Sequence, residues 1–383
     1  MEQRVCNIYL FLVWKVIRVL FGYLQEVYWN VLYKTMGRDE DHNWLVYSFS
    51  RTHVYLVRLP ADSAHFSIDT HPFLYGSSFS EATLAARLPL EDFWRETKSL
   101  FDRRELDDSK FVFYTSGPRA GSTLLGKMLH HEGRCRVVGE PPIMGALATA
   151  INNGLWSTAL ECERAVEAAL KFDSRVQTAG ETVVLKACSW GAYFVPIVKK
   201  VAPFFRHFYL FRSKSRAGVE RLVRYDEASK QVLYSLWKLN PNLGCFFSNT
   251  VGLYNPFLKA TKASGFAEVA QVYYLSAHRT FAQHGSLFDM DEALNYEDIV
   301  RSKERRTQLL QKAMRFCNIP LEDKYLDEAE RCLSRDSQAG TPYQQSKLAD
   351  KQLTSISDEQ RRRLREIALR LGFSAEEAAE FDT

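Results

Sequence analysis

From residue 111 onward, short apolar runs alternate with segments whose apolar residues recur at helical spacing. The runs at 111–115, 182–187 and 207–211 are short and rich in β-branched or aromatic residues, as expected for buried strands. After the first run, helical spacing is seen at Leu124, Leu125, Met128 and Leu129. This alternation predicts an α/β fold with three layers around a central, largely parallel sheet.

Local signals predict a helix near the end of the sequence and a hairpin near its start. Ser357 and Gln360 have the spacing of a capping box, and Gly372 stands where the terminal glycine of that helix is expected. The polar run at 334–350 predicts a surface loop, which we interpret as a candidate lid. Alternating and β-branched segments within 44–59 predict the hairpin.

Residues 6–33 have a broad apolar face, with most polar residues on one helical stripe. Lys15 and Arg18 interrupt the apolar run before it reaches the roughly 18 residues that a membrane span needs, which disfavours a simple transmembrane helix. The pattern predicts an amphipathic helix with three interpretations: packing on the catalytic domain, contact with a membrane surface, or a short signal anchor of a Golgi-type enzyme. Cytoplasmic, membrane-associated and Golgi locations therefore all stay open.

The length of 383 residues suits one catalytic domain with a smaller appended part. We assign the amphipathic helix to 1–34, an extension with the hairpin to 35–107, and the catalytic domain to 108–383. A formal net charge of +4 is too small to indicate a nucleic-acid partner. The 7 cysteines are widely separated and include no Cys-x-x-Cys pair, so neither a zinc site nor a disulfide framework is indicated.

A candidate phosphate-binding loop follows the first apolar run directly and precedes the first helical pattern. It consists of Ser116, Gly117, Pro118, Arg119, Ala120, Gly121, Ser122 and Thr123. Backbone N–H groups at such a strand-to-helix turn converge on an anion, and the glycines allow a close approach. The alternative is an ordinary Gly-Pro turn followed by a Ser/Thr helix cap.

The loop differs from the usual nucleoside triphosphate motif because no lysine precedes Ser122 and Thr123. In that motif the lysine reaches the terminal phosphates and the hydroxyl holds magnesium. A phosphoryl group carries charge that magnesium neutralises during transfer. A sulfuryl group carries less, so side-chain cations suffice and no metal is expected.

Residues Pro118 to Thr123 resemble the donor loop of the sulfotransferases, which bind 3'-phosphoadenosine 5'-phosphosulfate through a Pro-[Lys/Arg]-Ser-Gly-[Ser/Thr]-[Ser/Thr] turn. The acidic segment at 138–141 is similar to the corresponding segment of the tyrosylprotein and carbohydrate sulfotransferases. Segments that resemble the family follow in the expected order at 138–141, 183–186, 208–212, 295–300 and 316–320. The resemblance spans roughly residues 111 to 373 and implies a P-loop-type domain.

The resemblance implies a role for each matching residue. Glu140 is expected to be the general base that accepts the proton of the acceptor hydroxyl. Lys186 and Arg119 are expected to stabilise the transferring group, and Arg212 with Arg216 to bind the 3'-phosphate. The donor-binding loop residues are Gly117, Pro118, Arg119, Ala120, Gly121, Ser122 and Thr123. The expected partner is a hydroxyl-bearing acceptor, which is a carbohydrate, a protein tyrosine or a small molecule.

Two positions depart from the family pattern. Glu220 stands eight residues after Arg212, where the family usually has a serine for the 3'-phosphate, and its charge would repel a phosphate. A shifted alignment that uses Ser213 or Ser215 is an alternative. Cys188 stands where cytosolic members have a histidine two residues after the strand lysine, which favours Glu140 as the base.

Each role has a structural alternative. Lys186 is also compatible with a snorkelling side chain at the end of a sheet, and Glu140 with a salt bridge or a helix cap. His130 and His131 are rival bases, but their place at the far end of the loop helix predicts that they face solvent or cap that helix. Tyr296 and the acidic pair after it are expected to orient loops near the site.

Two other functions remain as alternatives. A P-loop kinase would need magnesium and a lysine that the loop lacks. The second is a sulfotransferase-like scaffold that has lost donor binding, which Glu220 would indicate. Such a scaffold would bind a membrane or a partner through residues 6–33.

Overall fold

The computed structural model describes residues 43–60, 66–103, 107–152, 154–187, 189–213, 218–219, 256–263, 266–339, 344 and 357–380. At the centre of the described residues is a five-stranded parallel sheet in the order β5-β6-β4-β7-β8. Its strands are β4 (Phe111–Ser116), β5 (Cys135–Gly139), β6 (Thr182–Lys186), β7 (Arg206–Phe211) and β8 (Leu294–Asn295). The predicted α/β fold with a parallel sheet is therefore confirmed.

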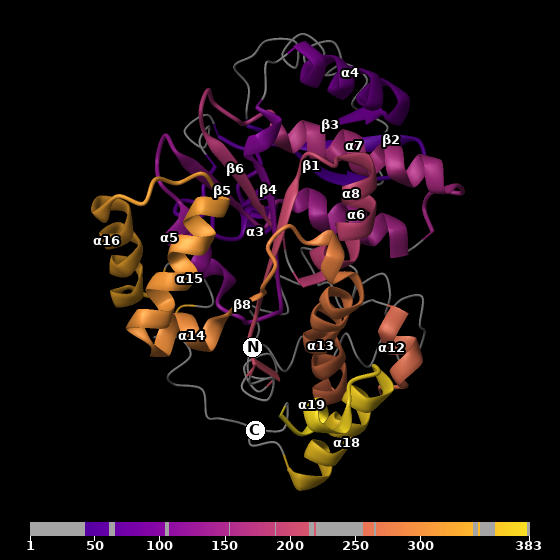
Figure 1. The fold of residues 1–383 in the computed structure, drawn as a ribbon. Helices are drawn as coiled ribbons and strands as arrows, with labels where there is room; N and C mark the ends of the chain where they lie inside the picture. Colours follow the sequence, from indigo (N-terminus) through magenta and orange to yellow (C-terminus); the bar gives the residue numbers. More distant parts are fainter. Residues whose placement is uncertain are drawn as a thin grey trace, which may run out of the picture.

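Helices cover both faces of the sheet (Figure 1). One face carries α5 (Ser122–Leu129), α14 (Tyr296–Arg301), α15 (Lys303–Phe316) and α16 (Asp323–Arg331). The other carries α6 (Pro142–Asn152), α7 (Ala159–Ser174), α8 (Val195–Val201) and α13 (Phe266–His284). Successive residues of β4 alternate between the two cores: Val112 and Tyr114 pack on the α5 side, Phe111 and Phe113 on the α7 side. Strands that are buried on both faces read as continuous apolar runs.

A second, antiparallel sheet precedes the parallel one. Its strands β1 (Trp44–Phe49) and β2 (His53–Arg58) form the predicted hairpin, and β3 (Leu84–Pro89) adds a third strand that was not predicted. The helices α3 (Leu74–Ser80) and α4 (Leu90–Arg103) accompany this sheet. Its buried residues belong to the same apolar core as the α7 face of the parallel sheet.

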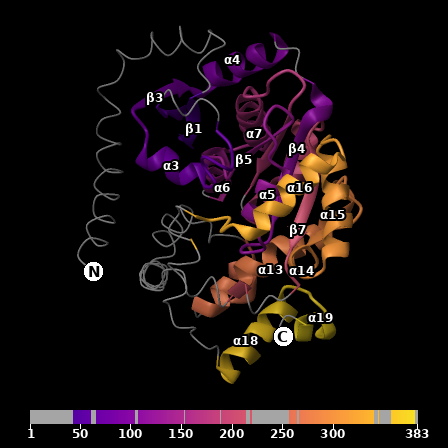
Figure 2. The same ribbon diagram turned by 90° about the vertical axis from the view of Figure 1, so that its left-hand side faces the viewer.

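The C-terminal helices lie at the end of the molecule opposite α4 (Figure 2). They are α18 (Asp358–Arg370) and α19 (Ala375–Glu380), next to α12 (Pro256–Thr261) and α13. The predicted capping box is present, because Ser357 and Gln360 each accept a hydrogen bond from the other's backbone N–H. Gly372 follows α18 with a left-handed φ of 85°. Short 3-10 turns complete the described elements: η3 (Asp108–Lys110), η4 (Ser189–Phe194), η5 (Gly285–Leu287) and η6 (Cys332–Ser334).

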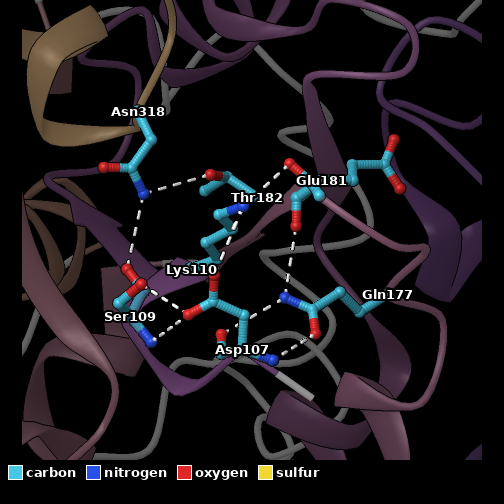
Figure 3. A network of polar contacts seen from close by, with 8 residues as sticks. Asp107, Ser109, Lys110, Gln177, Glu181, Thr182 and Asn318 are labelled. Carbon is cyan, nitrogen blue, oxygen red and sulfur yellow. Dashed lines mark hydrogen bonds and ion pairs between the residues drawn. The ribbon is translucent and has the colours of Figure 1, made fainter. Parts of the chain in front are cut away.

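A network of polar contacts fixes the amino-terminal edge of the sheet (Figure 3). Asn318, which ends α15 with a left-handed φ of 54°, donates from its side chain to the Ser109 carbonyl and the Thr182 hydroxyl at 3.4 and 3.3 Å. Asparagine tolerates this conformation better than most residues. The side chain of Gln177 exchanges two hydrogen bonds with the backbone of Asp107. These contacts tie the segments before β4 and β6 to each other and to the residues that follow α15.

Asp173 is a buried carboxyl group in the described core. It lies on α7 with 6% of its surface exposed, and its Oδ2 atom has no hydrogen-bond partner. Burial raises the pKa of Asp173 from 3.8 to about 7, although the Arg175 charge opposes this shift. Because the folded-state pKa lies above the unfolded one, the folded chain binds more protons between these two values. Its stability therefore falls as the pH rises from about 4 to about 7.

We expect Asp173→Asn to remove this pH-dependent loss. Relative to the wild type, the variant should gain up to about 4 kcal/mol of unfolding free energy between pH 4 and pH 8. Urea unfolding at several pH values within this interval measures the difference. Equal pH slopes for the two proteins would show that Asp173 does not titrate as described.

Candidate active site at the carboxyl edge of the sheet

The predicted site residues gather at the carboxyl ends of the parallel strands. The candidate donor loop follows β4, Glu140 follows β5, Lys186 ends β6 and Arg212 follows β7. In the described sheet, β5 and β6 lie on one side of β4, and β7 and β8 lie on the other. The strand order therefore reverses at β4. Open α/β sheets bind their ligands at the carboxyl ends of strands where the order reverses in this way.

The donor loop is a tight turn between β4 and α5. Gly117 donates its N–H to the Leu210 carbonyl at 2.9 Å, which fastens the loop to β7. Arg119 and Gly121 have left-handed φ values of 59° and 81°. Gly121 is the N-cap of α5, and no side chain forms a capping hydrogen bond there. The alternative of a Ser/Thr helix cap is therefore wrong, and the first turn of α5 keeps the N–H groups that suit an anion.

Two glycines let other parts of the site approach this loop and its helix. A Cβ atom on Gly121 would lie 2.2 Å from Cδ2 of Tyr296, so only glycine lets that ring lie against the loop. A Cβ atom on Gly126, one turn into α5, would lie 3.6 Å from Cδ of Lys186 and 2.4 Å from Cδ1 of Ile68. The stem of Lys186 therefore runs beside α5, on the same face of the sheet as the donor loop.

Lys186 and Glu140 form a short ion pair at the ends of neighbouring strands. Lys186 Nζ lies 2.6 Å from Glu140 Oε1, with 0% of the lysine side chain and 15% of the glutamate side chain exposed. The Glu140 N–H also donates to the Lys186 carbonyl at 2.9 Å, and Glu140 has a left-handed φ of 47°. A snorkelling Lys186 is therefore wrong. The salt bridge considered as an alternative for Glu140 is present.

Residues 71–75, which lie between β2 and β3 in the chain, form a wall beside this ion pair. The Tyr75 N–H donates to the Glu140 carbonyl at 3.1 Å, and the Phe73 ring centre lies 5.8 Å from Lys186 Nζ. The Pro72 carbonyl oxygen lies 2.6 Å from the position a Cβ atom on Gly139 would take. Sequence reasoning assigned no chemistry to this segment, because its role depends on contacts between residues far apart in the chain.

Arg212 is held by groups from two helices, α13 and α14. Its guanidinium centre lies 4.1 Å from the ring centre of Tyr296, and its Nε atom lies 3.5 Å from Oε1 of Glu297. Its carbonyl accepts a hydrogen bond from the Tyr274 hydroxyl at 2.8 Å. Only 3% of the Arg212 side chain is exposed. Tyr296 and Glu297, which are expected to orient loops near the site, therefore both contact the Arg212 side chain.

Ser213 is engaged by a carboxylate in this structure. Its N–H and its hydroxyl both donate to Glu297 Oε2, at 3.0 and 3.2 Å. Sequence reasoning missed this contact, because it arises only when β8 pairs with β7 and brings Glu297 beside Ser213. The shifted alignment through Ser213 would thus require a phosphate to compete with an internal anion.

Arg119 reaches toward the polar segment that follows η6. Its Nη2 atom donates to Oε1 of Gln338 at 3.4 Å. Residues 334–339 of the predicted loop at 334–350 are described, so this part of the segment contacts the donor loop. The described part of the candidate lid thus contacts Arg119 through Gln338.

Several sequence predictions concern residues outside the described ranges. Among them are the amphipathic helix at 6–33, Arg216, Glu220, Ser215 and Cys188. Within the described ranges, no helix has the length and the apolar character that would let it cross a membrane.

Of the two rival histidines, His130 is half-buried and His131 is buried. His130 caps the end of α5, and its Nδ1 atom lies 3.1 Å from the Cys135 carbonyl oxygen. His131 is buried, and its Nδ1 atom lies 2.9 Å from Oε2 of Glu328 on α16. Both follow the far end of α5, so the prediction that they are remote from the loop is confirmed and the prediction of a solvent-facing His131 is wrong.

The described residues contain no group of three or more His, Cys, Asp or Glu side chains arranged to hold a metal ion. Cys135, Cys162, Cys317 and Cys332 carry free thiols. Burial raises the pKa of the Cys135, Cys162 and Cys332 thiols, which disfavours the reactive thiolate form.

No protein-family model matches the sequence, and no curated protein matches it. Two solved structures are similar to the described fold at low identity. The sulfotransferase domain from the curacin biosynthetic pathway has a TM-score of 0.36 at 17% identity, over 69% of this chain and 98% of that domain. A sulfotransferase from Mycobacterium avium has a TM-score of 0.37 at 11% identity, over 64% of this chain and 72% of that protein. At these values, the function has to be argued from the residues of this chain.

Proposed function

We propose that this protein is a sulfotransferase that moves a sulfuryl group from 3'-phosphoadenosine 5'-phosphosulfate to an acceptor hydroxyl. The observation that carries the proposal is the Lys186–Glu140 pair, whose Nζ and Oε1 atoms are 2.6 Å apart on the same side of the sheet as the donor loop. Lys186, the cation for the transferring group, and Glu140, the base for the acceptor, thus lie next to each other at the edge of the sheet where the anion-binding loop follows β4.

The reaction we propose is an in-line displacement. The acceptor oxygen forms a bond to sulfur while the bond from sulfur to the bridging phosphate oxygen breaks. Glu140 takes the acceptor proton, and the electron pair of the broken bond leaves with 3'-phosphoadenosine 5'-phosphate. Negative charge grows on the leaving oxygen, so Lys186, Arg119 and the loop N–H groups stabilise the transition state more than the ground state.

The ion pair gives Lys186 and Glu140 complementary tasks. In this structure, the ion pair holds the carboxylate at a fixed position, which a general base requires. When the anionic donor reaches Lys186, the ammonium group gains a second acceptor. The carboxylate is then more available to the acceptor proton, so donor arrival and base activation are linked through one side chain.

Arg212 supplies the most distant cation of the proposed donor site. Its place after β7, beside the loop after β4, suits the 3'-phosphate of a nucleotide whose 5'-phosphosulfate lies on the loop. The loop has no lysine before Ser122, so it lacks the cation that a nucleoside triphosphate site places there. We therefore propose the bisphosphate nucleotide, and not a triphosphate, as the ligand.

Nucleotide-dependent thermal melting tests the proposal. At about 100 times its dissociation constant, 3'-phosphoadenosine 5'-phosphate should add roughly 2.7 kcal/mol of stability, and ATP with magnesium should add much less. Arg119→Ala should weaken this stabilisation, whereas Lys324→Ala on α16, far from the loop, should not. A larger effect of ATP with magnesium would support a kinase, and no effect of either nucleotide would support a scaffold that does not bind the donor.

A further inference from the structure

The ring of Tyr296 lies between the donor loop and Arg212. A Cβ atom on Gly121 would lie 2.2 and 2.3 Å from Cδ2 and Cε2 of this ring, so the ring is in contact with the N-cap of α5. The guanidinium centre of Arg212 lies 4.1 Å from the ring centre, within the range of a cation–π contact. One planar side chain therefore sets how far the loop and the arginine are apart.

Neighbouring groups keep Arg212 on this ring. Glu297, the next residue after Tyr296, lies 3.5 Å from the Nε atom and accepts both hydrogen bonds from Ser213. The Tyr274 hydroxyl holds the Arg212 carbonyl at 2.8 Å. Backbone pairing of Phe211 with Asn295 brings the two segments into register. Both the backbone and the side chain of Arg212 are thus tied to the segment that carries Tyr296.

We propose that Tyr296 is a positioning residue that matches the separation of Arg212 and the donor loop to the two phosphates of one nucleotide. The inference rests on the proposed function. The 5' and 3' groups of a ribose are held at a nearly fixed separation, so two anion subsites bind both groups only if their own separation fits. With the ring removed, Arg212 loses its support, and the site should no longer distinguish a 3',5'-bisphosphate from a 5'-monophosphate.

Calorimetric titration of the full chain with 3'-phosphoadenosine 5'-phosphate and with adenosine 5'-phosphate tests this inference. The wild type should prefer the bisphosphate. Tyr296→Ala should lower the ratio of the two affinities by about ten- to a hundredfold. This is the loss expected when Arg212 no longer forms one hydrogen bond to the charged 3'-phosphate. Tyr296→Phe keeps the ring and should keep the ratio. Tyr296→Leu fills most of the space but offers no aromatic face, and should also lower the ratio.

Tyr325→Ala is the matched control, because Tyr325 is a buried tyrosine on α16 whose ring centre lies 4.5 Å from Lys324 Nζ. It should lower stability without changing the affinity ratio. An unchanged ratio in Tyr296→Ala or Tyr296→Leu, or an equal change in Tyr325→Ala, would overturn the inference while the proposed function stands. Equal binding of the two nucleotides by the wild type would overturn the inference, because Arg212 would then not bind the 3'-phosphate. Binding of neither nucleotide would overturn the proposed function as well.

Discussion

Lys186→Met should lower kcat for sulfuryl transfer by at least about a hundredfold, the usual loss when one preorganised group that stabilises transition-state charge is removed. The side chain is completely buried beside α5, where its ammonium group pairs with Glu140. Methionine preserves most of the apolar stem, so the core next to Gly126 stays filled. Loss of the pair partner of Glu140 should cost about 1–3 kcal/mol of stability, less than for a fully buried carboxylate, because 15% of the Glu140 side chain meets water.

A radiolabelled donor and an acceptor with a free hydroxyl group provide the assay, with circular dichroism to verify the fold. Lys127→Met is the matched control, since this lysine lies in the last turn of α5. It should transfer at the wild-type rate. Wild-type kcat in Lys186→Met would contradict the assigned role of the lysine.

Glu140→Gln should lower kcat by about a hundred- to ten-thousandfold, the contribution typical of a general base. Glutamine has nearly the same shape, and its amide oxygen can still accept a hydrogen bond from Lys186 Nζ. The donor site should therefore keep its affinity for 3'-phosphoadenosine 5'-phosphate while the chemical step fails. A loss of kcat without a loss of nucleotide affinity separates this variant from one with a damaged donor loop.

Glu328→Gln offers a matched control for Glu140→Gln. Glu328 is also a carboxylate paired with a basic side chain, His131, but it lies on α16. Its replacement should leave both kcat and nucleotide affinity at the wild-type level. If Glu140→Gln retains full activity, another group must accept the proton, and the base assigned here is wrong.

The sequence predicted the parts of the sheet in which burial on both faces leaves a continuous apolar run. This holds for β4, β6 and β7, whereas alternating and β-branched residues predicted the hairpin of β1 and β2. Strand β5 is harder to recognise, because Arg136 is the second of its five residues and interrupts the apolar run. That arginine is buried and pairs with Glu181 at 3.0 Å, a contact that only the folded chain reveals. Strand β8 has two residues, too few for any pattern.

The site could be predicted only as far as its local motifs reach. The donor loop, Glu140, Lys186 and Arg212 each stand at the end of a strand, so their meeting at one edge follows from a parallel sheet. The contacts that orient them are of another kind. The Glu297–Ser213 hydrogen bonds join residues 84 positions apart, and the Lys186–Glu140 pair joins residues 46 positions apart. Such pairs depend on strand register, which no short motif encodes.

The wall formed by residues 71–75 has a consequence for how small an active version of this protein can be. The proposed catalytic groups all lie after residue 108, yet the carbonyl of Glu140 and the ammonium of Lys186 are sheltered by Tyr75 and Phe73. A fragment that begins at β4 would admit water to the ion pair and weaken its electrostatic effect. Deletions within residues 71–75 should therefore lower catalytic activity, although these residues contribute no reacting group.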